Sequence, residues 1–450
     1  MQTDITEPPY AEITSAKTSN YFTKEHFQEQ LQRIKDASDV AQKKIDYATA
    51  HNDEILYAIE IVEQFLRKSG RICYGGQAIN AHLPNSHKIY DPTYSIPDYD
   101  FFSPSPDQDL TKITNALQRA GFTEISIREG MHEGTTKVYV NFIPVADCTE
   151  LHSKIYDTLY KRSAVFDGIH YMDASSLRML MYLELSRPRG EVSRWGKVFE
   201  RLMIFNEFLP AKHCNIYHKN PVVTETHINI MVSYCVDHTR IFAGADLIEF
   251  YEHAIQKGIE LRISTNKPVL FYSPHSRKDA MNLVSLFRSY DHKKYTVKTI
   301  TIHKSDVVPY FTMIMHGKHI MACIIEYSAC HSYIRVPFKN HATKKKDHIH
   351  IASLDTIITL YFSLGLLDKR LFNIGSMECM ANKLVEICLK TRVRHGSTTL
   401  PFISIECQGY QKTLPSLIRE KVERITRKRN AEKRNADKRK TVRNLKKRLL

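Results

Sequence analysis

The sequence predicts a mixed α/β (α+β) protein with two sheet-containing domains, and three observations support this class. Short β-prone runs alternate with helical stretches over residues 71–172, which is typical of a sheet covered by helices. A second set of strand and helix patterns follows over residues 225–415. With 450 residues, the chain is long enough for two or three domains.

Five regions are predicted in chain order. Apolar residues recur at helical spacing before Gly70, which is suited to end a helix, and the stretch after Asp173 is again helical. The regions are residues 1–70 (N-terminal arm and helices), 71–172 (an α/β domain with a mixed sheet), 173–224 (a helical connector), 225–415 (a second α/β domain with a mixed sheet) and 416–450 (a basic tail).

The positive charge of the chain is concentrated in the tail. The net charge is +15, and residues 419–450 hold 15 Lys and Arg against 4 Asp and Glu, a net of +11. The other residues therefore carry about +4, since 15 − 11 = 4. This distribution indicates a polyanionic partner such as a nucleic acid. A nuclear targeting signal is an alternative interpretation, and the tail is expected to be a long solvated helix or disordered.

Cysteine usage and hydropathy predict reduced thiols and no membrane span. The 9 cysteines are scattered without a Cys-x-x-Cys pair. Residues 1–10 are polar and acidic, unlike a signal peptide. The most apolar long stretch, residues 351–367, contains Asp355 and is too short to cross a bilayer, so we expect a buried helix there.

A pair of glycines follows the first predicted strand, residues 72–74. Gly75 and Gly76 lead into a helix start at Gln77. This order places bare backbone N–H groups at a helix N-terminus, where they can bind phosphate. The alternative is an ordinary strand-to-helix turn.

Two aspartates one residue apart open the next predicted strand. On a strand, Asp98 and Asp100 point to the same face. Paired carboxylates repel each other unless a cation lies between them, and Mg²⁺ prefers oxygen ligands. The alternative is a solvated surface turn after Pro97.

A third carboxylate is expected on a neighbouring strand, because two-metal phosphoryl transfer needs further ligands. Asp147 is the acid nearest the far end of a predicted strand over residues 138–143, and Asn141 lies in the middle of that strand. Asp147 could instead cap a helix before Thr149. The sequence leaves open whether Asp147 or no residue supplies the third carboxylate.

Basic residues recur at two further places. Arg189, Arg194 and Lys197 lie on and after a constrained Pro-Gly turn, where they can bind a triphosphate or form a solvated connector. In the second domain, lysines and arginines interleaved with Tyr and His indicate a surface that binds a nucleic-acid strand, with ordinary edge and loop lysines as the alternative. The candidate RNA-binding residues are Lys344, Lys345, Lys346, Arg427, Lys428 and Arg429.

These motifs resemble a known family. The strings Tyr-Gly-Gly-Gln-Ala-Ile-Asn (74–80), Pro-Asp-Tyr-Asp-Phe-Phe (97–102) and Val-Asn-Phe-Ile-Pro-Val-Ala-Asp (140–147) are similar to the catalytic poly(A) polymerase subunits of large nucleocytoplasmic DNA viruses. So is the region from residue 177 to residue 197. The superfamily is the DNA polymerase β-like nucleotidyltransferases, and the longer spacer before Asp98 departs from its usual pattern by an inserted loop near residues 84–94.

The resemblance implies template-independent addition of AMP from ATP to an mRNA 3′ end with two Mg²⁺ or Mn²⁺ ions. Asp98, Asp100 and Asp147 would be catalytic and hold the metal ions. The nucleotide-binding residues would be Gly75, Gly76, Gln77, Asn80, Arg189, Arg194 and Lys197. The family also implies viral transcripts as substrates, host cytoplasm and virus particles as locations, and a homodimer or a viral processivity partner. A nucleotidyltransferase with a non-RNA acceptor and an inactive RNA-tethering subunit are the alternatives.

Overall fold

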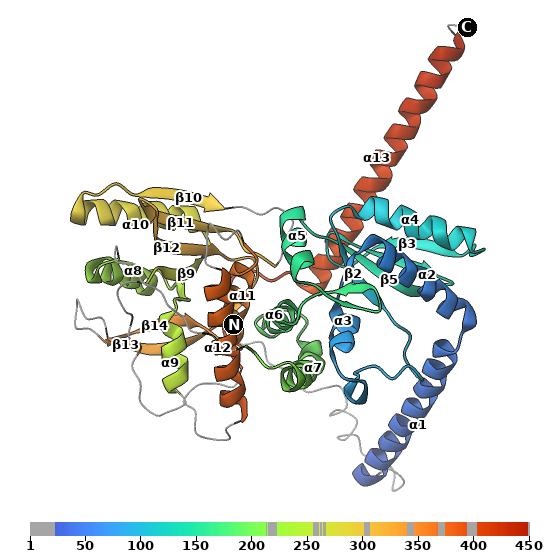
Figure 1. The fold of residues 1–450 in the computed structure, drawn as a ribbon, viewed down its shortest axis with the longest axis horizontal. Helices are drawn as coiled ribbons and strands as arrows, with labels where there is room; N and C mark the ends of the chain where they lie inside the picture. The colour runs from blue at the N-terminus through green and yellow to red at the C-terminus, as the bar shows by residue number, and fades with distance from the viewer. Residues whose placement is uncertain are drawn as a thin grey trace.

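The computed structural model describes residues 23–448 apart from residues 213, 215–222, 255–260, 262, 264–266, 301–306, 340–345, 368–373 and 394–402. It confirms the predicted fold class. Two mixed sheets occupy the two halves of the molecule, and helices α6, α11 and α12 lie between them (Figure 1).

The first sheet has the strand order β3-β4-β5-β2-β1-β7-β6, with β2 and β5 parallel at its centre. The predicted apolar stripe of α2 is buried against it, and Gly70 ends α2 in the left-handed conformation. The elements are α1 (Lys24–Ala50), α2 (Asp53–Ser69), β1 (Ile72–Tyr74), α3 (Gly75–His82), β2 (Tyr99–Ser103), α4 (Pro106–Arg119), β3 (Ile125–Glu129), β4 (Thr135–Val140), β5 (Ile143–Glu150), α5 (Ser153–Arg162), β6 (Ala164–Phe166) and β7 (Ile169–Tyr171).

The connector contains two helices, and the first of them packs against the second domain. Asp173 caps the first, accepting hydrogen bonds from the Ser175 and Ser176 backbone N–H groups at 3.1 and 3.2 Å. This helix, α6 (Ala174–Leu185), packs on α11 (Leu354–Leu364) and on α7 (Trp195–Phe208). The predicted buried helix near residue 355 is confirmed, because every residue of α11 after Leu354 is buried.

The second sheet has the order β10-β11-β12-β9-β8-β14-β13-β15. A tight turn joins β11 to β12, with Gly317 at φ +58°. The remaining elements are α8 (Glu225–Asp237), β8 (Ile241–Phe242), α9 (Asp246–Ala254), β9 (Val269–Ser273), α10 (Ser276–Asp291), β10 (Thr296–Ile300), β11 (Phe311–His316), β12 (His319–Glu326), β13 (His331–Lys339), β14 (Lys346–Ala352), α12 (Ile374–Val393), β15 (Cys407–Gln408) and α13 (Leu414–Arg448).

The two sheets repeat one another strand for strand. Adding seven to each strand number of the first sheet, so that β1 becomes β8 and β7 becomes β14, gives the order of the second sheet, apart from the added β15. The pairings agree as well, since β1–β2 and β8–β9 are antiparallel while β2–β5 and β9–β12 are parallel. The chain is therefore built from two copies of one α/β topology.

A buried Arg–Asp–Ser cluster fixes the crossover in the first half. Arg71, directly before β1, donates through Nε to Asp109 Oδ2 at 2.5 Å and through Nη2 to Oδ1 at 3.2 Å. Ser103, at the end of β2, donates to the same carboxylate at 2.6 Å. Asp109 is on α4 and fully buried, so this cluster ties β1, β2 and α4 together.

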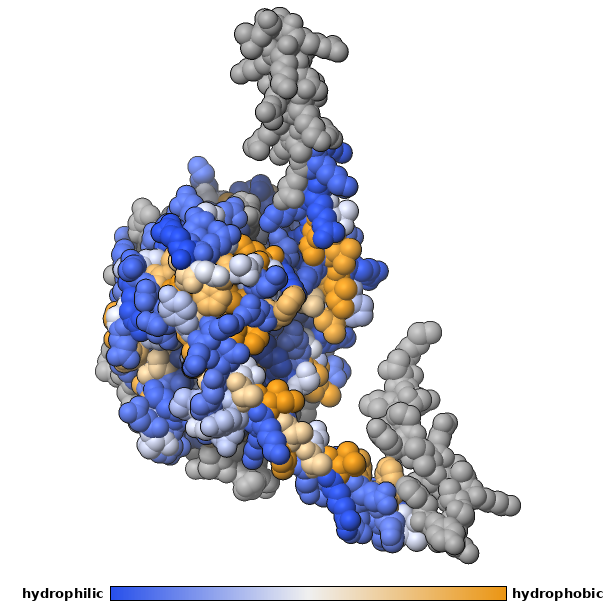
Figure 2. Space-filling view, turned by 90° about the vertical axis from the view of Figure 1, so that its right-hand side faces the viewer, coloured by the Kyte–Doolittle hydropathy of each residue, from blue (hydrophilic) through white to orange (hydrophobic). Residues whose placement is uncertain are grey.

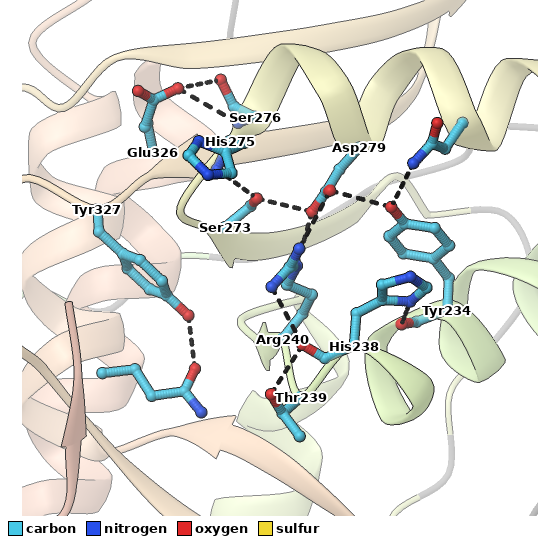
Figure 3. Close-up of polar contacts among 12 residues, drawn as sticks. Tyr234, His238, Thr239, Arg240, Ser273, His275, Ser276, Asp279, Glu326 and Tyr327 are labelled. Atoms are coloured by element: carbon cyan, nitrogen blue, oxygen red, sulfur yellow. Dashed lines mark hydrogen bonds and ion pairs between the residues drawn. The ribbon is translucent and has the colours of Figure 1, made fainter.

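The second half contains the same cluster with the same spacing (Figure 3). Arg240, directly before β8, donates through Nε to Asp279 Oδ2 at 2.6 Å. Ser273, at the end of β9, donates to Oδ2 at 2.6 Å, and Tyr234 donates to Oδ1 at 2.9 Å. The six-residue interval from Ser103 to Asp109 thus recurs from Ser273 to Asp279.

Helices α1 and α13 project from the body (Figures 1 and 2). In α1, Ile34, Val40 and Ile45 are exposed. The base of α13 exposes Ile418 and Val422 beside charged side chains, and Figure 2 shows these hydrophobic and hydrophilic surfaces next to each other. Of the two alternatives for the tail, the structure has the long helix.

The expectation of reduced thiols is wrong for four cysteines. The structure pairs Cys214 with Cys379 and Cys330 with Cys407, while the other five cysteines are buried outside any disulfide. The paired cysteines are 165 and 77 residues apart in the sequence. They could not be predicted, because sequence spacing alone does not show which residues lie close together in the fold. Among the described residues, no helix is both long enough and apolar enough to span a bilayer.

Replacing Asp109 by Asn tests the first buried cluster. The substitution leaves the Arg71 guanidinium without its anionic partner, so we expect the free energy of unfolding to fall by about 3 kcal/mol. Asp107→Asn is the matched control, since Asp107 is exposed on the same helix. The measurement is urea unfolding, and equal stability of the two variants would show that the cluster is dispensable.

Candidate active site

Strand β2 brings two carboxylates to one face of the first sheet. Asp100 is the second residue of β2, and Asp98 directly precedes the strand, so both point away from α2. The alternate residues Tyr99 and Phe101 face α2, where the Tyr99 hydroxyl donates to Glu63 at 2.7 Å. The predicted alignment of the two aspartates is therefore present.

The neighbouring strand places Asp147 beside Asp100. In the parallel β2–β5 pairing, these two residues are direct partners. Asp147 lies inside β5 and not before a helix, so the alternative of a helix cap is wrong. The prediction that Asn141 lies in mid-strand is also wrong, because Asn141 and Phe142 form the positive-φ turn that joins β4 to β5.

Burial and neighbouring carboxylates raise the pKa values of Asp98 and Asp100. Burial, followed by the charges of Asp98 and Asp147, raises the pKa of Asp100 to about 7. Desolvation by the surrounding protein, followed by the negative charge of Asp147, also raises the pKa of Asp98. Asp98 nevertheless remains exposed to solvent. Such mutual repulsion is the condition that a bound cation relieves.

The residues fit a divalent cation in their chemistry. Oδ1 of Asp147 is buried without a hydrogen-bond partner, and neither the Asp98 nor the Asp100 carboxylate forms a side-chain hydrogen bond or ion pair with a described residue. Oδ2 of Asp147 is paired with the Lys137 ammonium. Within the described ranges, no three carboxylate, histidine or cysteine side chains are already arranged to hold one metal ion. A cation bound by Asp147 would have to compete with the Lys137 ammonium for this carboxylate.

The N-terminus of α3 lies against the carboxylates. Gly75 has φ +70°, and a Cβ built on it would overlap with Oδ2 of Asp100. No side chain caps this helix, so its first backbone N–H groups lack a capping acceptor. Gly75 thus allows the start of α3 to approach Asp100 closely, and the first turn also contains Gln77.

Asn80 has a structural contact that the sequence did not predict. Its Oδ1 accepts the backbone N–H groups of Ile89 and Tyr90 at 2.9 and 3.4 Å, which holds the inserted loop. The loop brings the Tyr90 hydroxyl against Gly76, where a built Cβ would overlap with it. Arg201 donates to that hydroxyl at 2.9 Å.

Helix α7 and the turn before it face the site with positive charge. Arg194 lowers the pKa of Asp100 through its charge, and it is paired with Glu184 and Glu191 at 3.4 and 3.3 Å. Arg201 and Arg194 lower the pKa of Lys197. Arg201 was missed, although the i, i+3, i+7 spacing of these three residues places them on one helix face. Arg189 is exposed on the preceding turn.

The candidate RNA-binding residues are placed only in part. Lys344 and Lys345 lie outside the described residues, and Lys346 begins β14. Arg427, Lys428 and Arg429 follow one another on α13, where Lys428 lies 3.6 Å from Glu129 on β3. Arg424 donates to the backbone carbonyl of Met131 at 3.2 Å. These contacts hold the base of α13 on the first domain.

The comparison with protein families shows which family the first domain resembles. The model of the family described as "Poly(A) polymerase catalytic subunit" matches residues 60–191. Residues 60–191 are therefore similar to this family. The resemblance predicted from the motifs is thereby confirmed, and the matched segment includes the glycine pair and all three aspartates.

Similar proteins come from large DNA viruses. A protein of Acanthamoeba polyphaga mimivirus, curated as a proposed poly(A) polymerase catalytic subunit, is 29% identical over 194 residues, which are 41% of this chain and 32% of that protein. The corresponding protein of African swine fever virus (isolate Pig/Kenya/KEN-50/1950) is 31% identical over 178 residues, or 38% and 36%. The alignment thus spans about a third of the length of these curated relatives.

A solved structure extends the likeness to the whole fold. The crystal structure of the Megavirus polyadenylate synthase matches with a TM-score of 0.71 and 18% identity, covering 92% of this chain and 85% of that one. At this identity the match shows the fold alone. It covers the second α/β domain as well as the first.

Replacing Asp100 by Asn tests the strain between the carboxylates. The folded pKa of about 7 exceeds the unfolded value near 3.9, so the metal-free fold is destabilised increasingly as the pH rises from about 4 to 7, and by the full amount above pH 7. In EDTA we expect Asp100→Asn to raise the free energy of unfolding by about 3 kcal/mol at pH 8 and by about 1 kcal/mol at pH 5. Urea unfolding measures both, and a variant less stable than the native protein at pH 8 would contradict the clustering.

Proposed function

We propose that the chain is a polynucleotide adenylyltransferase that adds AMP from ATP to mRNA 3′ ends without a template. The observation that carries the proposal is the row formed by Asp147, Asp100 and Gly75 across β5, β2 and the start of α3. It brings cation ligands and phosphate-binding amides into contact. The family match of residues 60–191 supports the same reaction.

The carboxylates have distinct roles in the proposed reaction. Asp98 and Asp100 hold two divalent ions, Mg²⁺ or Mn²⁺, and Asp147 completes the ligand set at its free Oδ1. When bound, the ions activate the RNA 3′-hydroxyl and stabilise the leaving pyrophosphate. The sheet holds all three side chains on one face, so the reactants are positioned by rigid elements. Phosphoryl transfer then needs no covalent enzyme intermediate.

The nucleotide binds at the β1 end of this row. Backbone N–H groups of Gly75, Gly76 and Gln77 bind the triphosphate, which the α3 dipole also favours. Arg194, Lys197 and Arg201 offset its negative charge, and Arg189 adds a cation on the turn. Asn80 contributes through the loop that it holds. The preference for ATP rests on the family alone.

The RNA acceptor approaches from the β4 end, next to Asp147. Helix α13 supports this direction, because its base is fixed to the β3–β4 hairpin by Arg424 and Lys428. Its positive charge binds the RNA backbone without reading bases. A further site for the RNA sugar-phosphate backbone lies in the second domain, at Lys344, Lys345 and Lys346.

The biological setting follows the viral relatives. We infer viral transcripts as substrates, host cytoplasm as the location, and packaging in virus particles. The second α/β domain and the exposed apolar side chains of α1 leave surface for a second copy or a processivity partner. We also propose that the five predicted regions act as functional units in this reaction. They are residues 1–70, 71–172, 173–224, 225–415 and 416–450.

Two other functions fit part of the structure. A nucleotidyltransferase with a small acceptor would use the same row of carboxylates, but it would not need the net charge of +11 in residues 419–450. An inactive RNA tether would need that charge, but it would not need three neighbouring carboxylates at a helix N-terminus. Only the proposed polymerase uses both features.

Extension of a labelled RNA oligonucleotide tests the proposal. With Mg²⁺ or Mn²⁺, we expect the native chain to add residues from ATP and not from the other nucleotides. The double variant Asp98→Asn/Asp100→Asn should lose at least a thousandfold in rate, because the metal ligands are removed. Asp107→Asn should retain full rate. RNA binding without extension by the native chain would instead favour the tether.

Removing residues 435–450 tests the tail while keeping its fixed base. The deletion removes seven Lys and Arg and one Asp. We expect shorter products at 150 mM salt, an unchanged first addition, and a salt dependence of RNA affinity that is shallower by about 3 in logarithmic slope. Substituting Lys438, Arg439 and Lys440 by Gln is the control that keeps the helix. RNA products of native length from both variants would show that the C-terminal tail does not hold the RNA during extension.

A further inference from the structure

Lys137 belongs to the same row as the candidate metal ligands. On β4 it is the direct partner of Asp147, which in turn is the partner of Asp100 on β2. Its ammonium is paired with Oδ2 of Asp147, and its side chain is one-third exposed. In the described part of the chain, no other Lys or Arg forms an ion pair with any of the three carboxylates.

We propose that Lys137 is a displaceable counter-ion that holds Asp147 until a divalent cation takes its place. The inference goes beyond the reaction itself and names a positioning residue that controls when the metal site forms. It rests on the proposed function only in taking the incoming anion to be a nucleoside triphosphate. Three observations carry it.

The first observation is that the two carboxylate oxygens of Asp147 have different surroundings. One oxygen is paired with Lys137, while the other is buried without a hydrogen-bond partner. A buried carboxylate oxygen without a partner is unfavourable, and a permanent structural pair would satisfy both oxygens. The half-satisfied state is the one expected of a ligand that awaits a cation.

The second observation is the incomplete ligand set. No three-ligand group is ready to hold a metal ion among the described residues, although three carboxylates adjoin one another. Lys137 explains this, because its positive charge occupies the place next to Asp147 and acts on Asp98 as well. A monovalent ammonium there repels a divalent ion.

The third observation is the position of Lys137 at one end of the row. The amides of Gly75 lie at the other end, against Asp100. A triphosphate bound there adds negative charge beside the carboxylates, and this charge favours a divalent ion over a single ammonium. Cation binding therefore depends on the nucleotide, and the partly exposed Lys137 side chain is free to move toward solvent.

Mn²⁺ binding to the full chain, followed by the electron paramagnetic resonance signal of free Mn²⁺, tests the inference without RNA or turnover. Without nucleotide, Lys137→Met should bind Mn²⁺ about tenfold more tightly than the native chain, since the competing charge is gone. An ATP analogue with a non-cleavable α–β linkage should tighten Mn²⁺ binding to the native chain at least tenfold and to Lys137→Met by much less.

Two variants control the measurement. Lys137→Arg keeps the positive charge and should behave like the native chain, which also shows that the position tolerates substitution. Lys161→Met removes an exposed lysine from α5 and should leave Mn²⁺ affinity unchanged. Lys137→Gln repeats the charge removal with a polar side chain.

Unchanged or weaker Mn²⁺ binding by both Lys137→Met and Lys137→Gln would overturn the inference and make the pair a structural one. The outcome is separate from that of the proposed function. A native chain that shows the Mn²⁺ effect but does not extend RNA would refute the polymerase and retain the counter-ion. If the native chain extends RNA but binds Mn²⁺ no more weakly than the Lys137→Met and Lys137→Gln variants, the polymerase is retained and the counter-ion is refuted.

Discussion

The parallel register between β2 and β5 is the constraint on which the candidate site depends. It makes Asp100 and Asp147 direct partners, and a slip by one residue would turn one of them to the opposite face. The two-residue turn at Asn141 and Phe142 sets where β5 begins, and Pro144 lies before the paired segment starts at Ala146. The proline therefore removes no hydrogen bond from the β2 pairing.

The two halves show which parts of the topology are structural and which are chemical. Both contain the Arg–Asp–Ser cluster, so that cluster serves the fold. The carboxylates do not recur: in the β9–β12 pairing, Leu270 and Cys323 stand at the positions of Asp100 and Asp147, and both are buried. The second half therefore keeps the scaffold without carboxylates at these two positions.

The sequence predicted the fold class and most of the site because both are local. The glycine pair, the Asp-x-Asp spacing and the two helices of the connector depend on neighbouring residues. The hairpin at Asn141 was missed because two short strands read as one run. The disulfides, the Tyr90–Arg201 contact and the Lys137 pair are tertiary, with partners 10 to 165 residues apart. The repetition of the halves was missed because it lies in strand order more than in residue identity.

A crystal of the full chain with Mn²⁺ and a non-cleavable ATP analogue is the most direct test of the central claim. We expect anomalous peaks within about 2.2 Å of oxygens from Asp98, Asp100 and Asp147, the triphosphate on the amides of Gly75 and Gly76, and the Lys137 ammonium away from Asp147. A nucleotide bound elsewhere, or Mn²⁺ peaks without these carboxylates, would contradict the account.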